Sequence, residues 1–283
     1  MLPTAPAQPQ SNAPAVSAAS HSSGSLTEFD APGAATVDSP ACDFGTGASF
    51  CGTLAYGIND EGTIIGYYTD VNVVAHGYVR TPGGSITSFD PPGAGTTPGL
   101  FLGTVAYTIN DRGVSAGNVQ GNDGVYHAWL RDRSGNFTEF DAPGAGTGFG
   151  QGSVAYETNV VGVTAGNFTD ASGTTHGFVR SRDGAIASFD PPASISTISQ
   201  GINTEGAITA FYATADGNYH AFLRAPSGSI TTIAPSDASG SYTVAAAIND
   251  LGVVTGYYVN STGGVRAYAR IPDGNYVTVN VPN

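Results

Sequence analysis

The residues of this sequence best suited to chemistry are histidines that each stand fourteen positions before an aspartate. The pairs are His76 with Asp90, His127 with Asp141, and His176 with Asp190. The pairing lapses at His220, which faces Ala234, and at Arg266, which faces Asn280. A histidine held by a carboxylate can act as a general base, but a catalytic group is normally unique and this pair recurs. We therefore predict structural His–Asp hydrogen bonds across a hairpin.

A second candidate, Glu157, stands out because it does not repeat. Its counterparts elsewhere in the chain are Gly57, Thr108, Gly201 and Ala247. It is the acid expected to face a central channel, where it is the candidate catalytic base. Glycoside hydrolysis requires a pair of carboxylates, and unrepeated acids are few in this sequence. Whether the chain is an enzyme stays open, and we lean toward a binding protein.

Repeated tyrosines are the candidate binding residues. Tyr56, Tyr107 and Tyr156 occupy equivalent positions. Tyrosine together with asparagine, serine and glycine forms good polar recognition surfaces. The alternative is that tyrosine is present for its strand propensity alone.

The elements that position these residues are internal repeats. One column reads His76, His127, His176, His220 and Arg266, with spacings of 51, 49, 44 and 46. A second column, Arg80, Arg131, Arg180, Arg224 and Arg270, has the same four spacings. Two columns with identical spacing define five repeats, at about 54–90, 105–141, 154–190, 198–234 and 244–281.

Each repeat reads as four short antiparallel strands separated by Asn-Asp and Gly turns, which is the size of a propeller blade. We therefore predict an all-β fold, a five-bladed β-propeller, with an open β-solenoid as the alternative. Residues 24–30 repeat the fourth-strand motif and are the predicted closing strand of a single domain at 24–283. The longest connections, 31–53, 91–104 and 142–153, fall on one rim, where a specific site would be built.

Composition narrows the partners. The formal charge is −13, and lysine is absent. Nucleic acid is therefore not an expected partner, since its binding needs a basic surface. No apolar run is long enough for membrane insertion. No cofactor fingerprint or metal-ligand set is present.

Two features of the N-terminal part of the chain bear on where the protein is located. Residues 1–23 read as a disordered leader rich in proline, alanine and serine, without an intact signal peptide. Cys42 and Cys51 are predicted to form a disulfide, with two free thiols as the alternative. A disulfide fits an oxidising compartment.

The repeat columns also resemble a known family. The pattern Asn-x-x-Gly, Gly-Tyr-Tyr, His-Gly/Ala-Phe-x-Arg and Phe-Asp resembles the extracellular HAF-repeat family of bacterial secreted proteins. The run HAFLR at 220–224 is the best copy, and the likeness covers about 54–281. The resemblance implies export and a propeller-like fold, and it implies no activity. Arg266 and Ala234 depart from the pattern.

These observations predict a secreted, monomeric propeller that binds an extracellular glycan or small molecule, with carbohydrate favoured. One alternative is a polysaccharide-active hydrolase or lyase on the same scaffold. The other is a structural or adhesive module of the cell envelope. Equivalent pockets between blades would favour the first interpretation, and one deep axial pocket with unrepeated polar residues would favour an enzyme.

Overall fold

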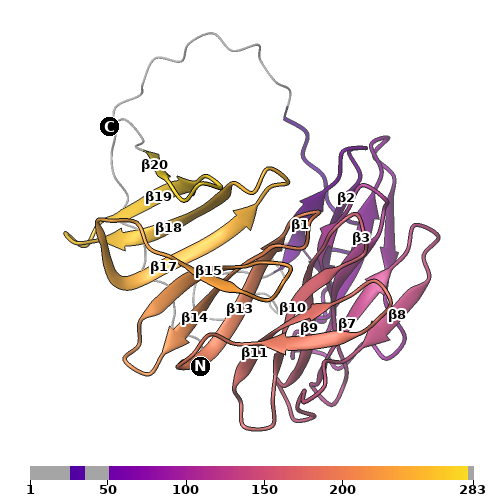
Figure 1. Ribbon diagram of the computed structural model, residues 1–283. Coiled ribbons are helices and arrows are strands. Elements are labelled where there is room, and N and C mark those ends of the chain that lie inside the picture. Colours follow the sequence, from indigo (N-terminus) through magenta and orange to yellow (C-terminus); the bar gives the residue numbers. More distant parts are fainter. Residues whose placement is uncertain (1–25, 36–50, 280–283) are drawn as a thin grey trace.

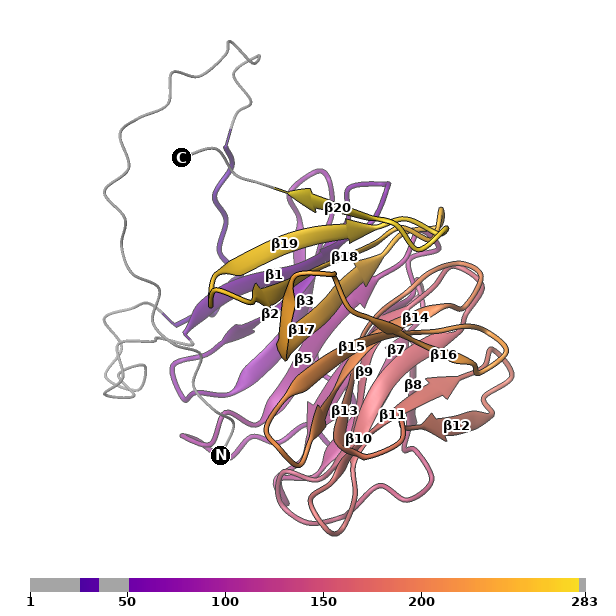
Figure 2. The same ribbon diagram turned by 60° about the vertical axis from the view of Figure 1, so that its left-hand side comes forward.

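A computed structural model describes residues 26–35 and 51–279 of the chain. The described residues form strands and turns without helix, so the prediction of an all-β fold is confirmed. None of them forms a helix with the length and hydropathy needed to cross a bilayer. Figures 1 and 2 show the strands in successive groups that follow one another around a common centre, from indigo to yellow.

The strands fall into five units of four. The first unit contains β1 (Gly52–Ile58), β2 (Ile64–Thr69), β3 (Ala75–Arg80) and β4 (Ile86–Phe89). The second contains β5 (Gly103–Ile109), β6 (Ser115–Gln120), β7 (Tyr126–Arg131) and β8 (Phe137–Phe140). The third contains β9 (Gly152–Thr158), β10 (Thr164–Thr169), β11 (Thr175–Arg180) and β12 (Ile186–Phe189). The fourth contains β13 (Ser194–Ile202), β14 (Ile208–Thr214), β15 (Tyr219–Arg224) and β16 (Ile230–Ile233). The fifth contains β17 (Ala238–Ile248), β18 (Val254–Asn260), β19 (Val265–Arg270) and β20 (Tyr276–Val279).

Within a unit, each strand pairs antiparallel with the next. The turn chemistry explains the first hairpin. Asn59 Oδ1 accepts a hydrogen bond from Thr63 N at 2.9 Å, and Gly62 adopts a φ of 78° that favours glycine. In the hairpin formed by β3 and β4, Arg80 pairs with Ile86.

Consecutive units dock through their inner strands and an asparagine ladder. β1, β5, β9, β13 and β17 contact one another in that order. Asn59, Asn110, Asn159 and Asn203 each donate from Nδ2 to the backbone carbonyl of the equivalent asparagine in the next unit, over 2.9–3.5 Å. A short parallel bridge, such as Ala75 with Gly103, also joins neighbours.

The core lies between the units. One aromatic residue of each third strand is at most 2% exposed: Tyr78, Trp129, Phe178, Phe222 and Tyr268. The prediction that this column is core is confirmed. The preceding fourth strand supplies a ring against it, as Phe89 does for Trp129 with centroids 5.6 Å apart.

The N-terminal segment takes the same place against the first unit. Phe29 contacts Tyr78 with ring centroids 6.1 Å apart, and the Arg80 guanidinium lies 4.7 Å from the Phe29 centroid. Residues 26–30 are extended but form no strand pairing in the structure. The segment thus caps the first unit as a preceding fourth strand would.

Candidate functional site

Each first strand carries a β-bulge near its end, and in three units the extra residue is a tyrosine. The bulge residues are Tyr56, Tyr107, Tyr156, Gln200 and Ala246. A bulge bends its strand and redirects a side chain. The inner strands therefore present tyrosine from the first three units, and glutamine or alanine from the other two.

These tyrosines meet near the centre of the molecule. The ring centroids of Tyr56 and Tyr107 lie 5.6 Å apart, and those of Tyr107 and Tyr156 lie 5.0 Å apart. Tyr67 of β2 stacks on Tyr56 at 5.6 Å. We call Tyr56, Tyr67, Tyr107 and Tyr156 the axial tyrosine cluster. The structure thus brings the three sequence-predicted binding residues together.

A cavity of about 530 Å³, the axial cavity, lies beside this cluster. Successive inner strands contribute Tyr107, Tyr156 and Ile198 to its wall. Phe101 and Gly150 come from the long connections before β5 and β9, where the sequence predicts an uneven rim. The cavity therefore combines repeated tyrosines with loop residues that do not repeat.

Two asparagines in the wall break the repeat pattern. Asn118 and Asn167 are 2% and 4% exposed. They occupy the second-strand position that holds Tyr67, Phe211 and Tyr257 in the other units. Asn167 Oδ1 accepts a hydrogen bond from Ser199 N at 2.8 Å, whereas its buried Nδ2 has no partner among the described residues. The wall therefore holds polar groups in two units only.

Burial raises the pKa of three tyrosines of the cluster. Desolvation raises the pKa of Tyr107 and Tyr156, and neighbouring tyrosines raise it further. The same causes raise the pKa of Tyr67. These hydroxyls stay neutral at any physiological pH and can donate hydrogen bonds.

Glu157 follows Tyr156 on β9 and lies against the next unit. Its Oε2 accepts a hydrogen bond from Ile202 N at 3.2 Å, and a Cβ added to Gly201 would lie 3.2 Å from that oxygen. Desolvation raises the pKa of Glu157 to about 7. In the described residues no hydrogen bond or ion pair joins it to a second carboxylate. The carboxyl can carry a proton near neutral pH but lacks the paired acid of a glycosidase.

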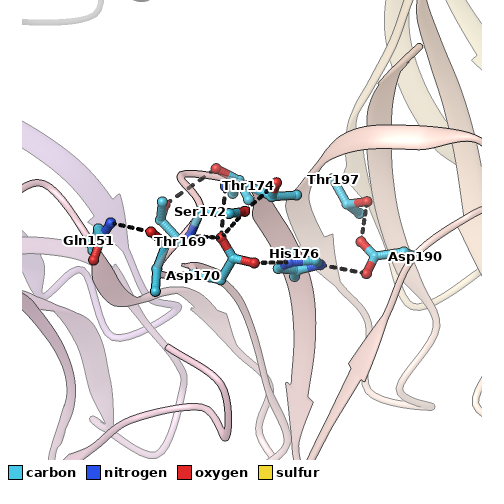
Figure 3. A network of polar contacts seen from close by, with 10 residues as sticks. Gln151, Thr169, Asp170, Ser172, Thr174, His176, Asp190 and Thr197 are labelled. Carbon is cyan, nitrogen blue, oxygen red and sulfur yellow. Dashed lines mark hydrogen bonds and ion pairs between the residues drawn. The ribbon is translucent and has the colours of Figure 1, made fainter. Parts of the chain in front are cut away.

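The His–Asp pairs form clasps between units. Nδ1 of His76, His127 and His176 lies 2.7–2.8 Å from Oδ2 of Asp90, Asp141 and Asp190, respectively. Thr104 and Thr197, on the first strands of the following units, donate to Asp90 and Asp190 over 2.5 Å. The third unit's network is shown in Figure 3, where His176 lies between Asp170 and Asp190.

Two of these histidines titrate above the ordinary range. Hydrogen bonding to Asp90 raises the pKa of His76 against a smaller effect of desolvation. For His176, desolvation lowers the pKa, but hydrogen bonds to Asp190 and Asp170 outweigh it and the net pKa is raised. The imidazole rings of His76 and His176 are thus held in hydrogen bonds to aspartate, which is consistent with a structural function.

Equivalent clefts lie between neighbouring units, beside the turns that follow the first strands. One cleft of about 190 Å³ is bounded by Val79 and Thr81 of the first unit and by Arg131 of the second. Another, of about 340 Å³, is bounded by the equivalent Val179 and Ser181 of the third unit and by Arg224 of the fourth. We call these the inter-unit clefts. Each is a repeat of the same arrangement.

Each inter-unit cleft has an arginine among its polar residues, together with Glu61 in the first cleft and Glu205 in the second. The guanidinium of Arg131 lies 4.9 Å from the centroid of Phe89, and that of Arg224 lies 5.0 Å from Phe189. Nε of both arginines is buried without a partner among the described residues. Desolvation lowers the pKa of both, but a guanidinium remains charged. The arginines therefore keep donor capacity.

The sequence predicts the tyrosines as binding residues but does not single out the asparagines, and it uses the arginine column only to define the repeats. The change from aromatic residues to Asn118 and Asn167 within one column was the available signal. Cys42 lies outside the described residues, so the predicted disulfide with Cys51 stays a prediction.

Comparison with known proteins supports the fold. No family model matches the chain, and no curated protein matches it. The BP39L lectin from Burkholderia pseudomallei is similar in structure, with a TM-score of 0.50 at 11% identity over 83% of this chain and 73% of that one. The chain therefore has a fold of the β-propeller class.

Two other solved structures are more distantly similar. The SapL1 lectin in complex with alpha methyl fucoside has a TM-score of 0.43 at 17% identity, over 82% of this chain and 80% of that one. TolB from Acinetobacter baumannii has a TM-score of 0.48 at 12% identity, over 77% of this chain and 53% of that one.

Proposed function

We propose that the protein binds carbohydrate through its inter-unit clefts. The observation that carries this proposal is the recurrence of one cleft at two junctions, each with an arginine whose Nε–H lacks a protein partner. Sugar hydroxyls are good acceptors for such donors, and hydrogen bonds from a charged donor are the stronger kind. Repeated sites suit a polymer of repeated sugars because linked contacts add avidity.

The walls of the clefts fit this ligand class. Val79 and Ile109 line one cleft, and Val179 and Ile186 line the other. An apolar wall with a few fixed donors is the usual composition of a small-ligand site. The likeness to the BP39L lectin supports the proposal at the level of fold only.

The test is replacement of both cleft arginines by methionine, which keeps side-chain bulk and removes the donors. We expect Arg131→Met/Arg224→Met to lose affinity for glycans bound by the wild type by about tenfold or more, since charged hydrogen bonds contribute about 1.5–3 kcal/mol each. Arg112→Met is the matched control, because Arg112 is an exposed turn residue outside both clefts. Glycan-array screening followed by calorimetry gives the measurement, and unchanged binding by a folded double variant contradicts the proposal.

We also propose that the five units are the blades of one five-bladed propeller, in which the fifth blade contacts the first only weakly. The repeat count and the order of inner-strand contacts support this count. Small-angle X-ray scattering tests it, since a stacked solenoid would give an elongated distance distribution.

An extracellular location and membership of the HAF-repeat family are further proposals, supported by the repeat motifs and the absence of lysine. Detection of the protein in the culture medium of its source tests the location. The hydrolase alternative would need a second carboxylate at Glu157, which the described contacts do not provide.

A further inference from the structure

The axial cavity is separate from the inter-unit clefts. We propose that it holds one uncharged, hydroxyl-bearing ring of about monosaccharide to disaccharide size. This inference does not depend on binding at the clefts. The clefts border the turns after the first strands, near Gly113 and Gly206, whereas the cavity borders the starts of those strands, at Gly103 and Gly152. None of the described residues lines both the axial cavity and an inter-unit cleft.

The wall chemistry selects an uncharged ligand. In the described structure, no aspartate, glutamate, histidine, lysine or arginine lines the axial cavity. A charged ligand would lose hydration there without gaining a countercharge, which is unfavourable. Its volume of about 530 Å³ falls within the roughly 300–1,000 Å³ range of small-molecule pockets.

Aromatic rings supply flat apolar surface on two sides. Tyr107 and Tyr156 come from the inner strands, and Phe101 and Tyr126 stand at the rim side. The apolar face of a sugar ring packs well against such rings, and the tyrosine hydroxyls remain neutral donors. The combination suits a ring with one apolar face and polar edges.

The asparagine pair supplies directional hydrogen bonding. Asn167 is anchored through its Oδ1 by Ser199 N, so its amide orientation is fixed. The Nδ2 of Asn167 is buried and has no protein partner in the described residues. Buried donors are normally paired, and a ligand hydroxyl oxygen would pair this one.

The two asparagines differ from the aromatic residues found at the same position in the other units, and this difference limits where the site can form. In the first and fourth units the same column holds Tyr67 and Phe211, whose rings would occupy the space that Asn118 and Asn167 leave open. Among the described residues, the aromatic side chain of this column is replaced by asparagine in the second and third units, which border the axial cavity. We expect one ligand per chain at this site.

Calorimetry on the full chain tests the proposal with a panel of neutral methyl glycosides and with glucuronate as the charged probe. The wild type should bind at least one neutral glycoside at one site and should bind glucuronate at least about tenfold more weakly there. Asn167→Asp keeps the acceptor for Ser199 N but replaces the free donor with a charged oxygen. It should weaken neutral-glycoside binding by about tenfold or more.

Asn118→Phe provides a second variant, since it introduces the aromatic type found in other units and fills the cavity. It should abolish this binding while the thermal transition shows a folded protein. Arg112→Met is the control and should leave this binding unchanged, because Arg112 is exposed and lines neither the axial cavity nor the two inter-unit clefts. The proposal is overturned if the wild type binds no neutral glycoside. It is also overturned if Asn118→Phe and Asn167→Asp both bind the glycoside as tightly as the wild type does. Preference for glucuronate overturns the ligand class.

Discussion

The second and fifth units share a fold but differ in what covers them. Ala116 and Ala128 of the second unit are fully buried beneath the third unit. Their counterparts in the fifth unit, Thr255 and Ala267, are exposed. Apolar side chains on the same face, including Tyr257 at 40% and Val265 at 72%, are also exposed. The face that docks every earlier unit on its successor is thus left open at the end of the array.

The sequence columns change at the same place. The second unit has the clasp of His127 and Asp141, whereas the fifth has Arg266 in place of the histidine. Asn110 is buried and its side chain is bonded to the next unit, while Asn249 is exposed and its side chain is bonded only to its own turn in the described structure. The histidine–aspartate pair and the cross-unit asparagine bond are therefore features that hold one unit against the next. Both are missing in the fifth unit, after which no described unit follows.

The largest expected effect comes from placing a charge on this face in each unit. Ala128→Arg should cost about 3 kcal/mol or more, because it buries an unpaired cation between units. Ala267→Arg should change stability by no more than about 0.5 kcal/mol at an exposed position. Urea denaturation of both variants gives the comparison. Equal destabilisation would mean that the first unit covers the fifth in solution, and the distinction drawn here would fail.

A second difference concerns ionisable groups near the axis, where the third unit has Glu157 and the fifth has Ala247. The folded-state pKa of Glu157 is about 7, raised by desolvation from about 4.5. Since the unfolded chain ionises first, folding stability falls as pH rises from about 4.5 to 7. Glu157→Gln should remove this fall and add about 3 kcal/mol at pH 8 but nothing at pH 4. Thermal denaturation across pH measures it, and a gain at pH 4 of the same size would contradict the assignment.

The asparagine ladder offers a smaller test of the same comparison. Asn110→Ala removes two bonds within the turn and the 2.9 Å bond to Asn159 O. Asn249→Ala removes turn bonds only. Asn110→Ala should therefore be more destabilising by about 1 kcal/mol, the net value of one hydrogen bond. Equal losses in chemical denaturation would show that the cross-unit bond adds nothing.

The scaffold was predictable from the sequence because each unit is built by local rules. The turn residues fix the hairpins, so the spacing of fourteen places His76 beside Asp90 without knowledge of the rest of the chain. The axial cavity was not predictable in the same way. It depends on the β-bulge that redirects Tyr107 and Tyr156 and on how adjacent units converge, neither of which the residue pattern specifies.

The His–Asp pairs also predict that the first and fifth units differ in how their contribution to stability depends on pH. Asp90 raises the pKa of His76 above 6.5, so the pair stabilises the fold fully below about pH 6.5 and loses this contribution as pH rises through the folded-state pKa. Asp90→Asn should therefore cost stability at about pH 6 and much less at about pH 9. The cost should not exceed about 1 kcal/mol, because both side chains are partly solvated. Arg266→Ala in the fifth unit is the control, since no histidine titrates at that position and its effect should not vary over this window. A pH-independent cost for Asp90→Asn, measured by urea denaturation at both pH values, would mean that the clasp acts as a neutral hydrogen bond rather than as an ion pair.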